Sequence, residues 1–204
     1  MPPERDVKEF ITGVILAGGR AQRMGGCDKG LIKLLGKPLV EYVIRALKPQ
    51  VAEMIINANR NHERYAAYGY PIIADLMDGF YGPLAGMASA MQAARTPYIV
   101  TTPCDSPFVP SDLVKRLYGG IEEQAAEIAV AHNGERLQPV FALLDRNLRS
   151  SIIAYLKRGE RKIDRWYEEH RLTIVDFSDQ PNTFVNVNTP EDVEIVESKL
   201  MQVR

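Results

Sequence analysis

The sequence predicts an α/β fold, a three-layer α/β/α sandwich built on a mainly parallel sheet. Short apolar, β-branched runs end at turn residues, and apolar residues at helical spacing follow several of these runs. The two patterns alternate along the chain. Such alternation is typical of a parallel sheet with helices on both faces. We therefore expect a Rossmann-like core, with an added hairpin region in the second half.

The opening unit is a strand, a loop and a helix. Ile11–Leu16 is an apolar run that stops at glycines, which predicts a buried parallel strand. A loop follows to about Gly36. Pro38 then stands where the first turn of a helix accepts proline. The apolar face of that helix is formed by Leu39, Tyr42, Val43, Ala46 and Leu47.

The same alternation continues to about residue 102. Further strands are expected at Met54–Asn57, Pro71–Ala74 and Tyr98–Thr102, and helices at His62–Ala67 and from Gly82-Pro83 onward. The second helix presents Leu84, Met87, Ala88 and Met91 on one face. The first half of the chain is thus predicted to form the parallel part of the sheet.

The second half adds a hairpin and more helices. Asn133-Gly134 separates two apolar runs, Ile128–Ala131 and Val140–Leu144, which is a strong hairpin signal. Helices are expected at 111–124, 146–157 and 161–169, and a strand at 172–176. Thr189 and Asp192 stand at capping-box spacing before a final helix. We expect an N-terminal extension over residues 1–10 and a single domain over 11–204.

Composition places the chain among cytoplasmic globular proteins. Its 204 residues are 46% hydrophobic and 25% charged, which suffices for one large core. No apolar run reaches the ~20 residues that span a bilayer, and the polar N-terminus does not resemble a signal peptide. Two cysteines do not suggest a disulfide framework or a zinc site. The net charge of -1 gives no footprint for nucleic acid.

A glycine-rich loop directly follows the first strand, over residues 16–29 (LAGGRAQRMGGCDK). Ligands of open α/β sheets bind at the carboxyl ends of strands. Gly18 and Gly19 let the backbone approach phosphate closely, and the cations Arg23 and Lys29 can hold a triphosphate. The loop matches neither GxxxxGK[ST] nor GxGxxG at the start of a helix, which disfavours a P-loop ATPase or a dehydrogenase.

Asp105 follows the strand at Tyr98–Thr102, between two prolines. It is expected at the same sheet edge as the glycine loop, where one carboxylate can bind Mg²⁺ shared with substrate phosphates. The three histidines, His62, His132 and His170, lie outside these motifs. An anionic phosphate nucleophile needs no general base, so positioning and charge neutralisation by Arg23, Lys29 and magnesium-bound Asp105 would suffice.

These motifs resemble those of molybdenum cofactor guanylyltransferases of the MobA type, within the larger nucleotidyltransferase group. The resemblance runs from Ile11 to about Val196. It is carried by residues 16–30 (LAGGRAQRMGGCDKG), 57–60 (NANR), 82–87 (GPLAGM), 103–108 (PCDSPF) and 184–191 (FVNVNTPE). One departure is Ala21, where many relatives in the wider group carry serine.

The resemblance implies that GMP is transferred from GTP to molybdenum-bound molybdopterin, with Mg²⁺ required and pyrophosphate released. By family analogy, the GTP-binding positions are Leu16, Ala17, Gly18, Lys29, Asn57, Asp75 and Asp105. Asp105 would also bind the magnesium ion. Asn186 and Asn188 would lie on the acceptor side, where their amides can both donate and accept hydrogen bonds.

Several points stay open from the sequence. Arg158, Arg161 and Lys162 fit either acceptor phosphates or a solvated helix surface. A cytidylyltransferase, a sugar-phosphate nucleotidyltransferase and an inactive nucleotide-binding regulator are the alternatives to the guanylyl transfer. Transient contacts with cofactor-synthesis proteins or recipient molybdoenzymes fit the resemblance, and a monomer is the default assembly.

Overall fold

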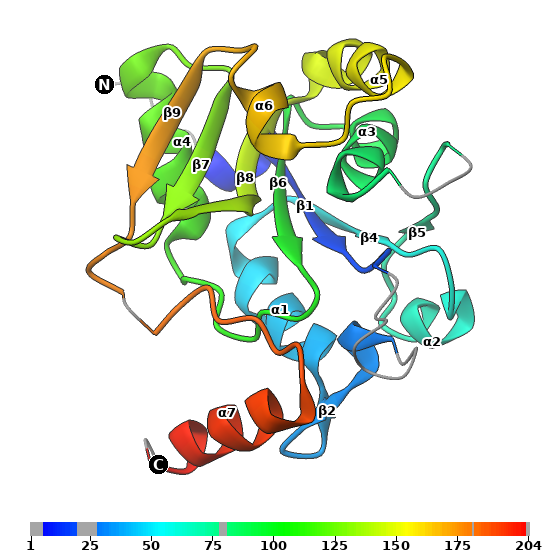
Figure 1. Ribbon diagram of the computed structural model, residues 1–204, viewed down its shortest axis with the longest axis vertical. Coiled ribbons are helices and arrows are strands. Elements are labelled where there is room, and N and C mark those ends of the chain that lie inside the picture. The colour runs from blue at the N-terminus through cyan, green and yellow to red at the C-terminus, as the bar shows by residue number, and fades with distance from the viewer. Residues whose placement is uncertain (1–5, 20–27, 78–80, 181, 203–204) are drawn as a thin grey trace.

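The computed structural model describes residues 6–19, 28–77, 81–180 and 182–202, and it has the predicted three-layer α/β/α architecture (Figure 1). Within these residues the central sheet has seven strands in the order β5-β4-β1-β6-β8-β7-β9. They are β1 Ile11–Leu16, β4 Glu53–Asn57, β5 Ile72–Ile73, β6 Tyr98–Pro103, β7 Ile128–His132, β8 Leu137–Asp145 and β9 Leu172–Asp176. Strand β8 is antiparallel to β6 and β7, and the other pairings are parallel, which confirms the mainly parallel sheet.

Helices follow the strands much as the sequence predicts. They are α1 Leu39–Leu47, α2 His62–Ala66, α3 Pro83–Ala93, α4 Leu113–Gln124, α5 Arg149–Lys157, α6 Ile163–Tyr167 and α7 Pro190–Gln202. Short 3₁₀ turns occupy Val7–Phe10, Lys29–Leu31, Lys48–Gln50 and Arg146–Leu148. In the described part of the chain, no helix combines the length and apolar character needed to cross a membrane.

The two faces of the sheet are buried by two separate cores. Alternation along β1 sends Ile11 and Ile15 into a core with α1 and α4, whereas Val14 joins a core with α3, α5 and α6. The largest buried side chain, Trp166, lies in the second core. Burial on both faces explains why the parallel strands read as continuous apolar runs.

The predicted hairpin at Asn133-Gly134 is confirmed, because β7 and β8 pair antiparallel on either side of it. The hairpin is built into the central sheet, since β8 lies between β6 and β7. Strand β9 then extends the sheet in parallel with β7.

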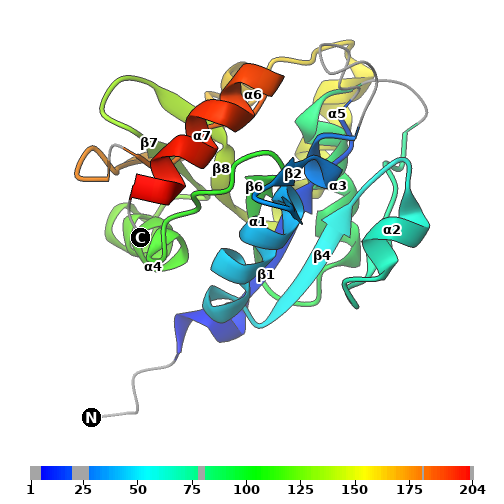
Figure 2. The ribbon, with the colours of Figure 1, turned by 90° about the horizontal axis from the view of Figure 1, so that it is seen from below.

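The segment predicted as a loop to about Gly36 leads into a small hairpin, β2 Lys33–Leu34 and β3 Lys37–Pro38. Pro38, predicted in the first helical turn, lies in β3 and caps α1, which begins at Leu39. Leu35 and Gly36 have positive φ angles of 48° and 80°, as a tight two-residue hairpin turn requires. The Leu35 N–H donates to Glu197 Oε1 of α7 at 2.6 Å, so a contact distant in sequence holds this turn. Helix α7 lies beside β2 and away from the central sheet (Figures 1 and 2).

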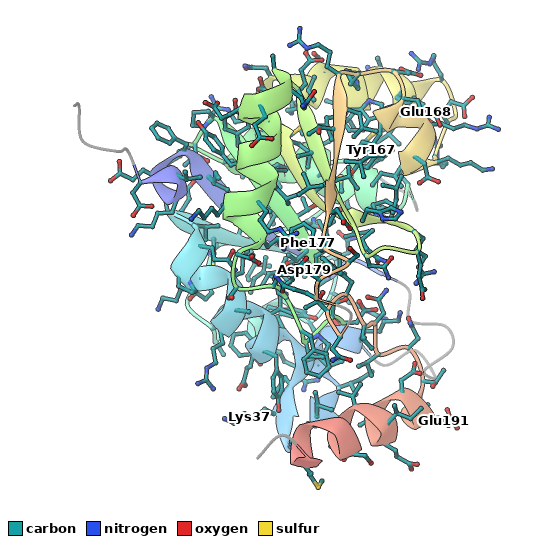
Figure 3. The ribbon with its side chains drawn as sticks, turned by 90° about the vertical axis from the view of Figure 1, so that its left-hand side faces the viewer. Lys37, Tyr167, Glu168, Phe177, Asp179 and Glu191 are labelled. Atoms are coloured by element: carbon teal, nitrogen blue, oxygen red, sulfur yellow. The ribbon has the colours of Figure 1, made fainter. Side chains whose placement is uncertain are left out.

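The final helix begins with the predicted capping box. The Asp192 N–H donates to Thr189 Oγ1, and the Thr189 N–H donates to Asp192 Oδ2 at 2.9 Å. Lys37 and Glu191, near β3 and at the start of α7, lie at one end of the molecule, and Glu168 lies at the other (Figure 3). The cap fixes where the chain leaves residues 184–189, which border the functional site.

Candidate functional site

A cavity of about 490 Å³ opens at the carboxyl ends of the parallel strands β1, β4 and β6. Parallel strands end at one edge of a sheet, so the residues that follow them converge there. Eight residues predicted from the sequence line this cavity: Leu16, Ala17, Gly18, Gly19, Lys29, Asn57, Asp75 and Asp105. The structure thus brings the glycine loop and the Asp105 loop to one place.

The Lys29 side chain joins three segments of the chain at this cavity. Its ammonium donates to Asp105 Oδ2 at 2.9 Å and to Asn188 Oδ1 at 2.5 Å. An ammonium has three N–H donors, and these two bonds use two of them. Lys29 therefore holds the Asp105 carboxylate beside Asn188 and still has a donor for a phosphate oxygen.

Backbone bonds fix the loop that carries Asp105. The Cys104 N–H donates to the Leu16 carbonyl at 3.1 Å, and the Asp105 carbonyl accepts from the Val187 N–H at 2.8 Å. Burial raises the pKa of the Cys104 thiol well above its usual value, with a smaller contribution from the Asp105 charge. Cys104 is buried and packs in the core that contains α1 and α4.

A network of amides and one carboxylate forms the opposite wall. Asn57 Nδ2 donates to Asp75 Oδ1 at 3.0 Å, and Asn59 Nδ2 donates to Asp75 Oδ2 at 2.8 Å. The Asp75 N–H returns a bond to Asn59 Oδ1. These bonds connect the ends of β4 and β5 and set the Asp75 carboxylate at the cavity.

Helix α3 approaches this wall closely because Gly86 has no side chain. A Cβ added at Gly86 would lie 2.9 Å from Leu16 Cδ2 and 3.0 Å from Asn57 Cγ. Gly82 precedes the helix with a φ of 69°, and Pro83 occupies its first turn. Both residues line the cavity, so the positive end of the α3 dipole faces it.

Asp28 also lines the cavity, although it is not among the residues predicted from the sequence. Its carboxylate accepts from Tyr65 Oη at 2.5 Å and from Asn61 Nδ2 at 3.0 Å. Arg60 lies 3.8 Å from the same carboxylate and also donates to the Gly19 carbonyl at 3.1 Å. Arg60 thus spans both described ends of the glycine-rich loop. The position of Asp28 next to Lys29 in the sequence is the signal that could have identified it as a site residue.

Other predicted residues lie elsewhere. Arg23 and Ala21 fall outside the described residues. Asn186 lines a second cavity that shares Pro103 and Val140 with the first. The histidines do not line the main cavity: His62 contacts the Ala58 carbonyl, His132 accepts from the Gly134 N–H, and His170 contacts Ser151.

The three basic residues before α6 do not line the main cavity themselves. Arg158 is paired with Glu169 at 2.7 Å, and Arg161 lies 4.1 Å from the centre of the Tyr81 ring, which lines the cavity. Lys162 is exposed. The surface interpretation therefore fits Arg158 and Lys162, and Arg161 contacts the cavity through Tyr81.

The donor set is suited to a hard cation that is shared with a ligand. Asp105 is 7% exposed and presents carboxylate oxygens at the cavity. Among the described residues, no group of three or more His, Cys, Asp or Glu side chains forms a metal cage. Magnesium typically takes one or two carboxylates and completes its shell with substrate phosphates and water. Asp105 fits that pattern.

Comparison with known proteins agrees with this geometry. Residues 13–173 match the family model of the MobA-like NTP transferase domain. The chain is 53% identical over 192 residues, covering 94% of it and 98% of the relative, to a molybdenum cofactor guanylyltransferase of Shewanella sp. strain MR-4. It is 55% identical over 181 residues to the enzyme of that name from Shewanella woodyi, covering 89% and 92% of the two chains.

A solved structure shows the same fold. The molybdopterin-guanine dinucleotide biosynthesis protein A of Archaeoglobus fulgidus superposes with a TM-score of 0.79 at 23% identity, covering 94% of this chain and 99% of that one.

The substitution Gly86→Ala tests the close approach of α3. The new methyl group would displace Asn57 or Leu16, and we expect the free energy of unfolding to fall by about 1–3 kcal/mol. Gly119→Ala in α4 is the matched control, since its Cβ would meet no atom within 4 Å. That control should gain up to about 1 kcal/mol from helix propensity. Urea unfolding measures both; equal stability of the two variants would contradict the packing.

Proposed function

The chain belongs to the family of MobA-like NTP transferase domains, and from this premise we propose that it transfers GMP from GTP to molybdenum-bound molybdopterin. The products are the guanine dinucleotide form of the cofactor and pyrophosphate. Relatives named guanylyltransferases, at 53% and 55% identity, favour this reaction over transfer of a cytidylyl or sugar nucleotide and over an inactive regulator.

The observation that carries the proposal is the junction of Lys29, Asp105 and Asn188. It lies where a cavity lined by Gly18, Gly19 and the start of α3 meets residues 184–189. The glycine side supplies backbone and dipole contacts for phosphates. A triphosphate in this cavity therefore has its reacting phosphorus beside Lys29, with the acceptor approaching from Asn188.

The reaction is a displacement at the α-phosphorus of GTP. An oxygen of the acceptor's phosphate forms a bond to that phosphorus as the bond to the bridging oxygen breaks, and pyrophosphate leaves with the electron pair. The nucleophile is already anionic, so no side chain needs to accept a proton. Lys29 neutralises charge on the phosphate oxygens, and the backbone of Gly18 and Gly19 orients the nucleotide.

Asp105 would hold a magnesium ion in this site, because it is the carboxylate beside Lys29 at the phosphate cavity. When bound, the ion supplies positive charge to the α- and β-phosphates. Asn57 and Asp75 bind the nucleoside end of GTP, and Arg23 acts on the phosphates from the glycine-rich loop. Asn186 and Asn188 bind the acceptor.

The proposal extends to the setting of the enzyme. Residues 11–204 act as one catalytic domain preceded by an extension over residues 1–10, in the cytoplasm and as a monomer. Its partners are GTP and molybdenum-molybdopterin as substrates, with transient contacts to cofactor-synthesis proteins or recipient molybdoenzymes.

Pyrophosphate release tests this function. Purified protein is given molybdopterin-bearing acceptor, Mg²⁺ and, in separate reactions, GTP, CTP, ATP or UTP. We expect release with GTP, and none above background when the acceptor or the metal is omitted. Pyrophosphate release with CTP and not with GTP would replace the guanylyl assignment with a cytidylyl one. If none of the four nucleotides gave pyrophosphate, the proposed transferase activity would be refuted.

The substitution Asp105→Asn removes the metal-binding charge at nearly constant size. We expect kcat to fall by at least about a hundredfold, because a metal ion contributes several kcal/mol to neutralising the transition state. Asp164→Asn, at an exposed position of α6, is the control and should keep its activity. Near-normal kcat for the Asp105 variant at saturating Mg²⁺ would remove Asp105 from the mechanism.

A further inference from the structure

Strand β8 contains a large bulge next to the second cavity. Val130 of β7 pairs with Ala142, and the next residue, Ala131, pairs with Gln138. Residues 139–141 of β8 therefore have no paired residue on β7. Bulges commonly occur beside active sites, where they redirect a side chain.

Buried side chains hold this bulge in place. The Val140 carbonyl accepts from Thr101 Oγ1 at 2.7 Å, and the Pro139 carbonyl accepts from Tyr167 Oη at 2.6 Å. Tyr167 of α6 (Figure 3) is 1% exposed, and burial raises its pKa, so its hydroxyl stays a donor. The bulge is thus fixed from two sides by dedicated hydrogen bonds.

Gln138, at the start of the bulge, carries a buried polar group that lacks a partner in the described part of the chain. The residue is 6% exposed, and no described atom bonds its side-chain nitrogen. A buried donor without a partner costs about 1–3 kcal/mol. Gln138 lines a cavity of about 210 Å³ together with Arg136, Pro139 and Asn186. Gln138 therefore combines an unpartnered buried amide nitrogen with a position in the wall of this cavity.

Asn186 in the same cavity is already oriented. Its Oδ1 accepts a hydrogen bond from Ser106 Oγ, on the loop that carries Asp105. With the oxygen engaged, the amide nitrogen of Asn186 is available to the cavity. Two carboxamides, Gln138 and Asn186, thus line one small space from two distant segments.

The strand order places this cavity on the acceptor side. Asn57 ends β4 and Asp75 follows β5, on one side of β1 and β6. Gln138 lies on β8, on the other side of β6, and Asp105 follows β6 itself. The two cavities meet at Pro103 and Val140. The second cavity therefore lies on the side of Asp105 that is away from the residues proposed to bind the nucleoside of GTP.

We propose that Gln138 determines acceptor specificity by binding the cyclic-amide edge of the pterin ring of molybdopterin. This inference rests on the proposed function. A carboxamide presents one donor group beside one acceptor and can form two bonds with a 2-amino-4-oxo-pyrimidine edge. Guanine carries the same edge, so the experiment must separate the two substrates.

The test compares Gln138→Leu and Gln138→Glu with the wild-type enzyme. Leucine removes both hydrogen-bonding groups, and glutamate keeps the length but loses the N–H donors. For both variants we expect KM for the molybdopterin-bearing acceptor to rise roughly tenfold while KM for GTP stays within about twofold. The melting temperature of Gln138→Leu should not fall below that of the wild type, because the substitution removes the unpartnered buried donor. Gln124→Leu, at an exposed position of α4, is the matched control.

The outcomes separate the claims. An unchanged acceptor KM in both variants, with wild-type transfer intact, would overturn the role of Gln138 and leave the guanylyltransferase standing. A rise in KM for GTP alone would assign the cavity to guanine and overturn the acceptor assignment. Lack of transfer by the wild-type enzyme would refute the proposed function, and the inference with it.

Discussion

The contact between Lys29 and its two partners organises the molecule around one point. Asp105 lies 76 residues away in sequence and Asn188 lies 159 residues away, yet both bond the same ammonium. This is feasible because β1 and β6 are adjacent and parallel, so the loops that follow them leave the sheet at one edge. The segment before α7 reaches the same edge through the bond between Val187 and Asp105.

Two departures from regular structure lie at this edge. Gly86 permits a close approach between α3 and Asn57, and the bulge at residues 139–141 interrupts the β7–β8 ladder. Each departure is compensated by specific contacts, as with the bonds from Thr101 and Tyr167 to the bulge. Gly86 and the bulge thus shape the walls of the two cavities.

Local pattern was enough to predict the sheet, most helix positions and the placement of Lys29 and Asp105. Asp105 comes just after β6, and Lys29 lies at the end of the loop that follows β1, so the parallel topology brings both loops to one edge of the sheet. Asn57 and Asp75 needed the family resemblance, because a polar residue at a strand end has many causes. The family membership is established, whereas the roles of these residues, and of Arg23, remain predictions.

Asp28 and Gln138 could not be assigned a role from the sequence, because their environments depend on distant residues. Asp28 is bound by Tyr65, which is 37 residues away in the sequence, and by Asn61, which is 33 residues away. Gln138 owes its position to a bulge held by α6. The Leu35-Gly36 turn has the same origin, since Leu35 adopts a positive φ and bonds Glu197 of α7. The environments of these residues depend on contacts between distant segments, which the hydrophobic periodicity of the sequence does not reveal.

The most direct test of the account follows the fate of individual phosphorus atoms. GTP radiolabelled at either the α- or the γ-phosphorus is incubated with the enzyme, Mg²⁺ and molybdopterin-bearing acceptor, and the acceptor is isolated. We expect the α label to appear in the acceptor and the γ label to appear in pyrophosphate. Transfer of the γ label to the acceptor, or no transfer of the α label, would contradict nucleotidyl transfer at the Lys29–Asp105 site.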